Sequence, residues 1–125
     1  MAKVAIVEDV PSLADMYRFK FEQAGFEVVV AYNGEEGLQK ITDFRPDLVL
    51  LDLMLPEMSG DQVLARVRAY DWGKGIRVLI LTNIGEDEAP ALLRTLNVDR
   101  YIVKADYTPA QVVDIVKEVL GQPQA

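Results

Sequence analysis

Residues 47–56 read Asp-Leu-Val-Leu-Leu-Asp-Leu-Met-Leu-Pro. Four consecutive apolar residues, 48–51, lead directly into the carboxylate of Asp52, and Pro56 ends the run. A short, continuous apolar run is typical of a strand that is covered on both faces of a sheet. A carboxylate is costly inside a core and ordinary at its edge. Asp52 is therefore a candidate functional residue, as a ligand or as a nucleophile.

Other short apolar runs alternate with amphipathic segments along the chain. The predicted strands cover residues 4–7, 26–31, 47–52, 77–82 and 100–103. The predicted helices cover residues 13–24, 33–42, 59–69, 87–96 and 109–120. This alternation predicts an α/β fold of the (βα)5 type, with a five-stranded parallel sheet and helices on both faces. Ligands of such sheets bind beyond the carboxyl ends of the strands.

Several of the predicted helices begin with recognisable signals. Ser12 has an acidic residue three positions on, which is the spacing of a capping box. Asn33 predicts an N-cap, and Thr108, directly before a proline, predicts another. Pro90 would fall in the first turn of the helix predicted over 87–96, where a missing N–H has little effect.

Composition limits the classes of protein that fit. The chain has 125 residues, half of them hydrophobic, which suits one domain over 1–121 with a short polar tail or linker stub over 122–125. No apolar run approaches the ~20 residues of a membrane span, and no signal peptide is visible, which fits the cytoplasm. A formal net charge of −7 argues against nucleic-acid binding by this domain. The absence of cysteine excludes disulfides, thiolate zinc sites and cysteine nucleophiles.

Chemically active residues stand at the carboxyl ends of four predicted strands. Glu8 and Asp9 follow the first strand, Asp52 ends the third, Thr82 ends the fourth and Lys104 follows the fifth. Three clustered carboxylates repel one another unless a cation is present. Oxygen ligands without histidine or cysteine suit Mg²⁺ or Mn²⁺. A carboxylate beside such an ion, an ammonium and a hydroxyl is a plausible phosphoryl acceptor.

Over nearly its whole length the chain resembles the receiver domain of two-component response regulators. The resemblance rests on Val7-Glu8-Asp9, on Leu51-Asp52-Leu53-Met54-Leu55-Pro56-Glu57-Met58-Ser59-Gly60, on Leu81-Thr82 and on Tyr101-Ile102-Val103-Lys104. It implies a flavodoxin-like fold with strand order 2-1-3-4-5. It also implies a signalling domain, not an enzyme, that promotes its own aspartyl phosphorylation and dephosphorylation.

The resemblance implies a metal site and a phosphoryl donor. Asp9 and Asp52 would ligate Mg²⁺ directly, Glu8 through water, and Met54 through its backbone carbonyl. Asp52 would take the phosphoryl group from a phosphohistidine of a histidine kinase or a histidine phosphotransfer protein. Because this chain contains no histidine, the donor must be another chain.

The same resemblance assigns residues to the phosphoryl group and to a switch. Lys104 would pair with the phosphoryl group, Thr82 would move to bond it, and Tyr101 would swing inward behind Thr82. Asn83 is predicted, with Thr82 and Lys104, as a catalytic or phosphate-contacting residue. The switch would remodel the face formed by residues 87–96, 100–103 and 109–120. A downstream target or a second copy of the chain would bind that face.

Three departures from the family pattern raise further expectations. Ala105 follows Lys104 where the family usually has a cis proline, so this loop is expected to be trans or strained. Asn83 follows Thr82 where alanine or glycine is usual, and either narrows access to Asp52 or faces solvent. Met54 and Ile84 are apolar where they flank the site, which predicts a long-lived phosphoryl group.

Three other readings compete with a phosphoacceptor. A hydrolase of the haloacid dehalogenase type would need a second aspartate where Met54 stands. A flavodoxin-like cofactor binder would need a hydroxyl- or glycine-rich loop where Glu8-Asp9-Val10-Pro11 stands. The third is a phosphorylation-inactive, receiver-like scaffold that binds partners constitutively. A stand-alone regulator, a phosphorelay shuttle and the receiver of a longer protein all remain open.

Overall fold

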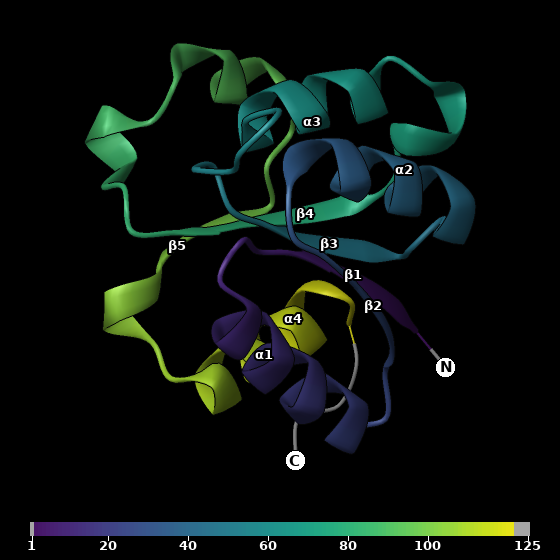
Figure 1. Ribbon diagram of the computed structural model, residues 1–125, viewed down its shortest axis with the longest axis vertical. Coiled ribbons are helices and arrows are strands. Elements are labelled where there is room, and N and C mark those ends of the chain that lie inside the picture. The colour runs from purple at the N-terminus through teal and green to yellow at the C-terminus, as the bar shows by residue number, and fades with distance from the viewer. Residues whose placement is uncertain (1, 122–125) are drawn as a thin grey trace.

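A parallel five-stranded sheet forms the centre of the chain, with strand order β2-β1-β3-β4-β5 (Figure 1). The computed structural model describes residues 2–121. The strands are β1 (Lys3–Val7), β2 (Glu27–Ala31), β3 (Leu48–Leu51), β4 (Arg77–Thr82) and β5 (Arg100–Val103). The predicted strand order is confirmed. The polar tail expected over 122–125 lies outside the described residues, so the domain boundary at 121 stays a prediction.

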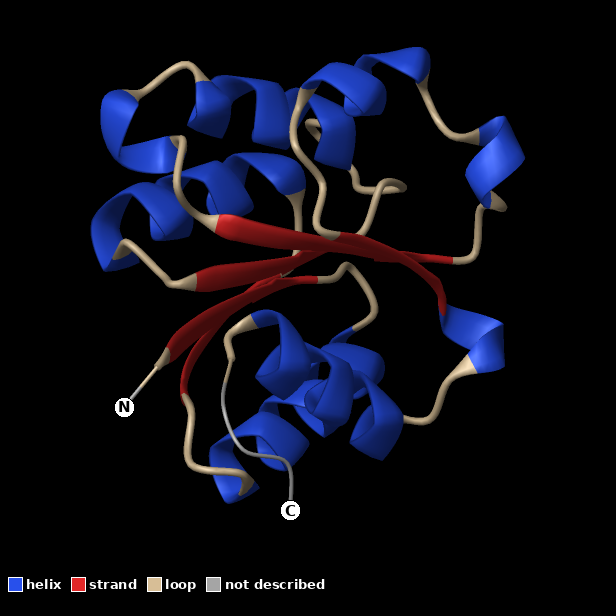
Figure 2. Cartoon of the chain, turned by 180° about the vertical axis from the view of Figure 1, so that it is seen from behind, coloured by secondary structure: helices blue, strands red, loops and turns tan. Residues whose placement is uncertain are grey.

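Helices cover both faces of the sheet, as predicted (Figures 1 and 2). Helices α1 (Pro11–Gln23) and α4 (Pro109–Val119) lie on one face, and α2 (Gly34–Phe44) and α3 (Gly60–Arg68) lie on the other. Strand side chains alternate between two apolar cores, one on each side of the sheet. No helix within residues 2–121 has the length and apolar character that crossing a bilayer requires.

Two of the predicted helix caps form as expected. The Asn33 side chain accepts a hydrogen bond from the Glu36 N–H (2.8 Å), and the Glu36 carboxylate accepts one from the Tyr32 N–H (2.8 Å). At the start of α4, the Thr108 hydroxyl accepts from the Gln111 N–H (3.2 Å), while the Gln111 side chain accepts from the Thr108 N–H (2.8 Å). Side chains therefore satisfy backbone donors that the first helical turn leaves free.

The predicted start of the first helix at Ser12 is wrong. Helix α1 begins at Pro11, its N-cap residue is Val10, and no side chain caps it. Proline at the first helical position has a backbone angle already suited to a helix, and its missing N–H would have no partner there. Pro11 therefore starts the helix one residue before the capping signal.

The α-helix predicted over 87–96 is also wrong. Between β4 and β5 the chain forms two short 3-10 turns, Glu86–Glu88 and Ala91–Thr95. Pro90 disfavours helical backbone at the preceding residue, and Ala89 is extended there (ψ 150°). Within residues 86–95 only Leu93 is buried, so this segment lacks the apolar face that stabilises a helix on a sheet. The described chain accordingly has four α-helices instead of the five predicted.

Candidate functional site

The parallel register brings the strand ends to one edge of the sheet. Val7 of β1 lies beside Leu51 of β3, and Thr82 of β4 lies beside Val103 of β5. The Asp52 N–H donates to the Val7 carbonyl (3.1 Å), so the pairing of β1 and β3 extends to Asp52 itself. The residues that follow these strands therefore share one edge.

Three carboxylates meet at this edge. Glu8 and Asp52 are buried, with 2% and 5% of their surface exposed, whereas Asp9 is exposed. One carboxylate oxygen from each lies within 4.8 Å of the others. An all-oxygen donor set, without histidine or cysteine, fits Mg²⁺ or Mn²⁺ better than zinc.

Lys104 reaches two of these carboxylates. Its Nζ donates to Asp52 Oδ2 (2.7 Å) and to Glu8 Oε1, and only 11% of its side chain is exposed. Burial alone would lower the pKa of Lys104, but its bonds to Asp52 and Glu8 outweigh burial and raise it. Burial raises the pKa of the Glu8 carboxyl, although the Lys104 ammonium opposes this shift. The site therefore holds a charged lysine beside two dehydrated acids.

Backbone donors hold the remaining oxygens of the two buried acids. The Met54 N–H donates to Asp52 Oδ1 (3.0 Å), and the Val10 N–H donates to Glu8 Oε2 (3.1 Å). Met54 bonds Asp52 through its backbone, and its side chain is 63% exposed. Both carboxylates are thus oriented from two sides, by Lys104 and by the loop that follows each strand.

Thr82 ends β4 and Tyr101 lies on β5, and their hydroxyl groups differ in hydrogen bonding. Thr82 is fully buried, and its Oγ1 has no hydrogen-bond partner within residues 2–121. A buried hydroxyl without a partner is destabilising, so Thr82 is suited to bond an incoming group. The partly buried Tyr101 donates from its hydroxyl to the Ile84 carbonyl (2.7 Å). Burial and, next, Glu86 raise the pKa of Tyr101.

The loops after β4 and β5 hold Asn83 and Ala105, two of the departures from the family pattern. Asn83 is exposed, so it faces solvent. No peptide bond between residues 2 and 121 is cis, so the loop at Ala105 is trans. Lys104 begins a 3-10 turn, Lys104–Asp106, and still reaches Asp52.

Sequence reasoning missed two residues of this site. Tyr17 occupies a core position on α1 and is 2% exposed; burial raises its pKa, and the charges of Lys104, Glu8 and Asp52 also act on it. Gly60 lies so close to Asp52 that a Cβ there would stand 2.0 Å from the Asp52 carbonyl oxygen. Tyr17 has the spacing of an ordinary core residue. Gly60 belongs to the stretch that carries the family resemblance, but its position at a helix start did not indicate its close approach to Asp52.

This geometry agrees with the comparison with known families. The response regulator receiver domain matches residues 4–117, and the chain belongs to this family. Receiver domains are signalling domains that bind Mg²⁺ in an acidic pocket and interact with kinases and phosphotransfer proteins.

The chain is similar to part of longer regulators and to nearly the whole of single receiver domains. The alkaline phosphatase synthesis transcriptional regulatory protein PhoP of Bacillus subtilis is 32% identical over 122 residues, which cover 98% of this chain and 50% of PhoP. The chain spans about half the length of this relative. A CheY-like receiver domain from Methanospirillum hungatei superposes with a TM-score of 0.88 at 27% identity, covering 97% of this chain and 94% of that one. TrrA from Thermotoga maritima, solved with Mg²⁺ and BeF, has a TM-score of 0.82 at 27% identity, covering 95% and 99%.

Proposed function

We propose that this chain is a phosphoacceptor receiver, in which Asp52 takes a phosphoryl group from a phosphohistidine of a partner kinase or phosphotransfer protein. The observation that carries the proposal is the Lys104 ammonium at 2.7 Å from Asp52, with three carboxylates within 4.8 Å of one another. The buried, unpartnered Thr82 hydroxyl beside them supports it. A phosphorylation-inactive scaffold would not need this combination of charges.

The residues divide the transfer step among them. An Asp52 carboxylate oxygen attacks phosphorus in line, while the bond from phosphorus to the partner's imidazole nitrogen breaks. The electron pair of that bond stays on the imidazole, which takes up a proton from solvent. Lys104 neutralises charge on the phosphoryl oxygens, and Thr82 donates a hydrogen bond to them.

Glu8, Asp9, Asp52 and the Met54 carbonyl would hold Mg²⁺, which when bound neutralises further charge on the phosphoryl oxygens. The TrrA structure, with Mg²⁺ and BeF, supports this assignment by similarity. The product stays on the protein as a signal, so no substrate is released. A target protein or a second copy of the chain would read it at the face formed by residues 84–97, β5 and α4.

The proposal also covers nucleic-acid binding and the location of the chain. Some relatives are named as DNA-binding regulators, such as MtrA of Mycolicibacterium smegmatis, of which the matched region covers 49%. The net charge of −7 supports a receiver that does not itself bind nucleic acid. A cytoplasmic location fits a partner that carries phosphohistidine.

A direct test is intact-mass measurement after incubation with phosphoramidate and Mg²⁺. We expect the parent protein to gain the mass of one phosphoryl group and Asp52→Asn to gain none, because the amide is a poor nucleophile. Asp43→Asn, which changes an exposed carboxylate on α2, serves as a matched control and should label like the parent. No gain in the parent, or an equal gain in Asp52→Asn, would refute the proposal.

We expect the phosphoryl group, once formed, to be long-lived. In the family pattern the positions of Met54 and Ile84 flank the site, and because both side chains are apolar, neither can orient a water molecule for attack. Replacing Met54 by asparagine should speed loss of the label by about tenfold, because an amide can hold that water in place. The measurement is the decay of the phosphorylated mass in Mg²⁺ buffer after the donor is removed. Rapid loss from the parent protein would contradict the expectation.

A further inference from the structure

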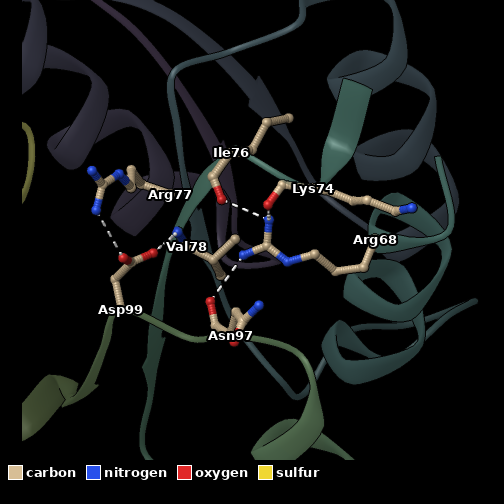
Figure 3. A network of polar contacts seen from close by, with 7 residues as sticks. All are labelled: Arg68, Lys74, Ile76, Arg77, Val78, Asn97 and Asp99. Atoms are coloured by element: carbon tan, nitrogen blue, oxygen red, sulfur yellow. Dashed lines mark hydrogen bonds and ion pairs between the residues drawn. The ribbon is translucent and has the colours of Figure 1, made fainter. Parts of the chain in front are cut away.

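Arg68, the last residue of α3, binds two separate loops through backbone carbonyl oxygens (Figure 3). Its Nε and Nη2 donate to the carbonyls of Leu96 and Asn97, both at 2.9 Å. Its Nη1 donates to the carbonyls of the loop before β4: Gly73 (2.7 Å), Ile76 (2.7 Å) and Lys74 (3.3 Å). One guanidinium thus joins the end of α3 to the segments that precede β4 and β5.

The Arg68 bonds are strong because the cation is partly buried and keeps its charge. Burial lowers the pKa of Arg68 and nearby Asp99 raises it, but a guanidinium stays protonated at neutral pH. Asp99 forms its own bonds, to the Val78 N–H (2.8 Å) and to Arg77 (3.3 Å), as Figure 3 shows. Within residues 2–121 no carboxylate forms an ion pair with Arg68, and the side-chain bonds described above all go to backbone carbonyls. Hydrogen bonds from charged donors are about twice as strong as neutral ones.

The segment between Ile84 and Leu96, residues 85–95, is called the strap below. The neutral Tyr101 hydroxyl holds its first end through the Ile84 carbonyl, and Arg68 holds its last end through Leu96 and Asn97. Between these ends the backbone bonds are local, as in Glu88 N–H to the Gly85 carbonyl (2.9 Å).

A cavity of about 540 Å³ lies between the strap and Tyr101, with Ala89, Leu93 and Val98 among its lining residues. Within the strap only Leu93 is buried. The strap therefore has little packing of its own and has space to move. Its two attachments differ in strength, and the weaker one belongs to the proposed switch residue.

We propose that Arg68 is a positioning residue for the switch: it fixes the Leu96–Asn97 end of the strap, so that a movement starting at Tyr101 stays within residues 85–95. The inference rests on the proposed function, since Asp52 phosphorylation starts the movement. Beyond Asn97 the Asp99 N–H donates to the Val78 carbonyl (2.8 Å), which leads directly into β5. A fixed strap end keeps β5 in register while the strap rearranges. A partner that binds both would then meet a changed strap beside an unchanged strand.

The first arm of the test uses residue-resolved hydrogen exchange by NMR on the unphosphorylated protein. In Arg68→Met the amides of Leu96 and Asp99 should exchange about tenfold faster, because their local opening loses its charged anchor. Arg66→Met, which changes an exposed arginine on the same helix, should leave both rates unchanged. The Ile6 amide in the interior strand β1 reports global unfolding, and the rise at Leu96 and Asp99 must exceed any rise at Ile6. Unchanged exchange in Arg68→Met, or an equal rise at Ile6, would overturn the inference that Arg68 fixes the Leu96–Asn97 end of the strap.

The second arm repeats the measurement after labelling with phosphoramidate, with intact mass verifying the product. In the parent protein we expect exchange to change across 85–95 and by less than about twofold at Leu96 and Asp99. In Arg68→Met the change should spread to Leu96 and Asp99. A parent change as large at Asp99 as within the strap, or no spread in Arg68→Met, would overturn the inference. A protein that gains no phosphoryl mass would refute the proposed function. The first arm needs no phosphorylation, so it tests independently whether Arg68 holds Leu96 and Asn97.

Discussion

Replacing Lys104 by methionine is expected to lower the free energy of unfolding by about 3 kcal/mol at pH 7 in buffer without divalent cations. Lys104 bonds both Glu8 and Asp52, and all three side chains are buried, with 11% or less exposed. Methionine keeps the length of the stem and removes the charge. The variant therefore leaves two dehydrated carboxylates facing each other without a cation, which is the costly way to break a buried ion pair.

The size of this effect should depend on pH in a direction set by Glu8. Its pKa is raised above the ordinary value of 4.5, so the folded state binds this proton more tightly than the unfolded chain does. Stability from Glu8 is therefore present below pH 4.5 and is lost as pH rises through the raised value. The deficit of Lys104→Met should be smallest below pH 4.5 and grow above it. The pKa of Lys104 is raised above 10.5, so in the parent protein its contribution is complete at pH 7 and is lost only as pH rises through that raised value.

Urea denaturation of Lys104→Met and the parent protein, with and without Mg²⁺, measures the effect. The ion should restore part of the lost stability, because it replaces the missing positive charge among the acids. Lys74→Met, which removes an exposed lysine paired with exposed Asp71, should change stability by less than about 0.5 kcal/mol. Equal losses in the two variants would show that Lys104 has no special role in holding the acids.

The strand ends could be predicted from the sequence because two independent constraints agree there. Apolar runs such as residues 48–51 must be covered on both faces, and alternation with helices makes the strands parallel. The carboxyl ends of parallel strands lie at one edge of the sheet, so the sequence alone predicts that Asp52 and Lys104 lie close together. The helix caps at Asn33 and Thr108 could also be predicted from the sequence, because each depends on residues only three positions apart.

The strap and its anchor could not be predicted, because they depend on contacts between distant parts of the chain. A helix is predicted over 87–96, but within residues 86–95 only Leu93 is buried, and Pro90 interrupts the helical backbone. Arg68 has the sequence position of an ordinary solvent-exposed arginine at a helix end. Its partners Leu96 and Asn97 lie 28 and 29 residues away. Every residue has a backbone carbonyl, so the residue types do not indicate which carbonyls accept these bonds.

Replacing Gly60 by alanine should lower the free energy of unfolding by about 3 kcal/mol. Gly60 is the first residue of α3, and its N–H donates to the Leu53 carbonyl (3.0 Å). An added Cβ would lie 2.0 Å from the Asp52 carbonyl oxygen and 2.9 Å from the Leu53 Cα. Both are backbone atoms, so no side-chain rotation relieves the overlap, and either α3 or the Asp52 backbone must shift.

Gly75→Ala is the matched control. Gly75 has no heavy atom within 4 Å of an added Cβ and is not among the glycines with positive φ. Alanine there should leave stability unchanged or raise it by about 0.4–1 kcal/mol, through the lower entropy of the unfolded chain. Thermal unfolding of both variants, beside the parent protein, measures the contrast. A Gly60→Ala protein as stable as Gly75→Ala would contradict the close approach of Gly60 to Asp52.

The same substitution separates a structural effect from an effect on the proposed chemistry. If the strain is relieved by moving α3, folded Gly60→Ala should label with phosphoramidate at nearly the parent rate. If the Asp52 backbone moves, its carboxylate shifts relative to Lys104, and labelling should slow by about 100-fold, since displacements near 1 Å are enough to cause losses of that size. The Asp52 N–H is already tied to Val7 and its Oδ1 to the Met54 N–H, so the chain around Asp52 is held on both sides. Helix α3 is attached through a loop, 53–59, and we expect it to move first. Labelling at a temperature where both proteins are folded should therefore remain within about tenfold of the parent rate, despite the large loss of stability.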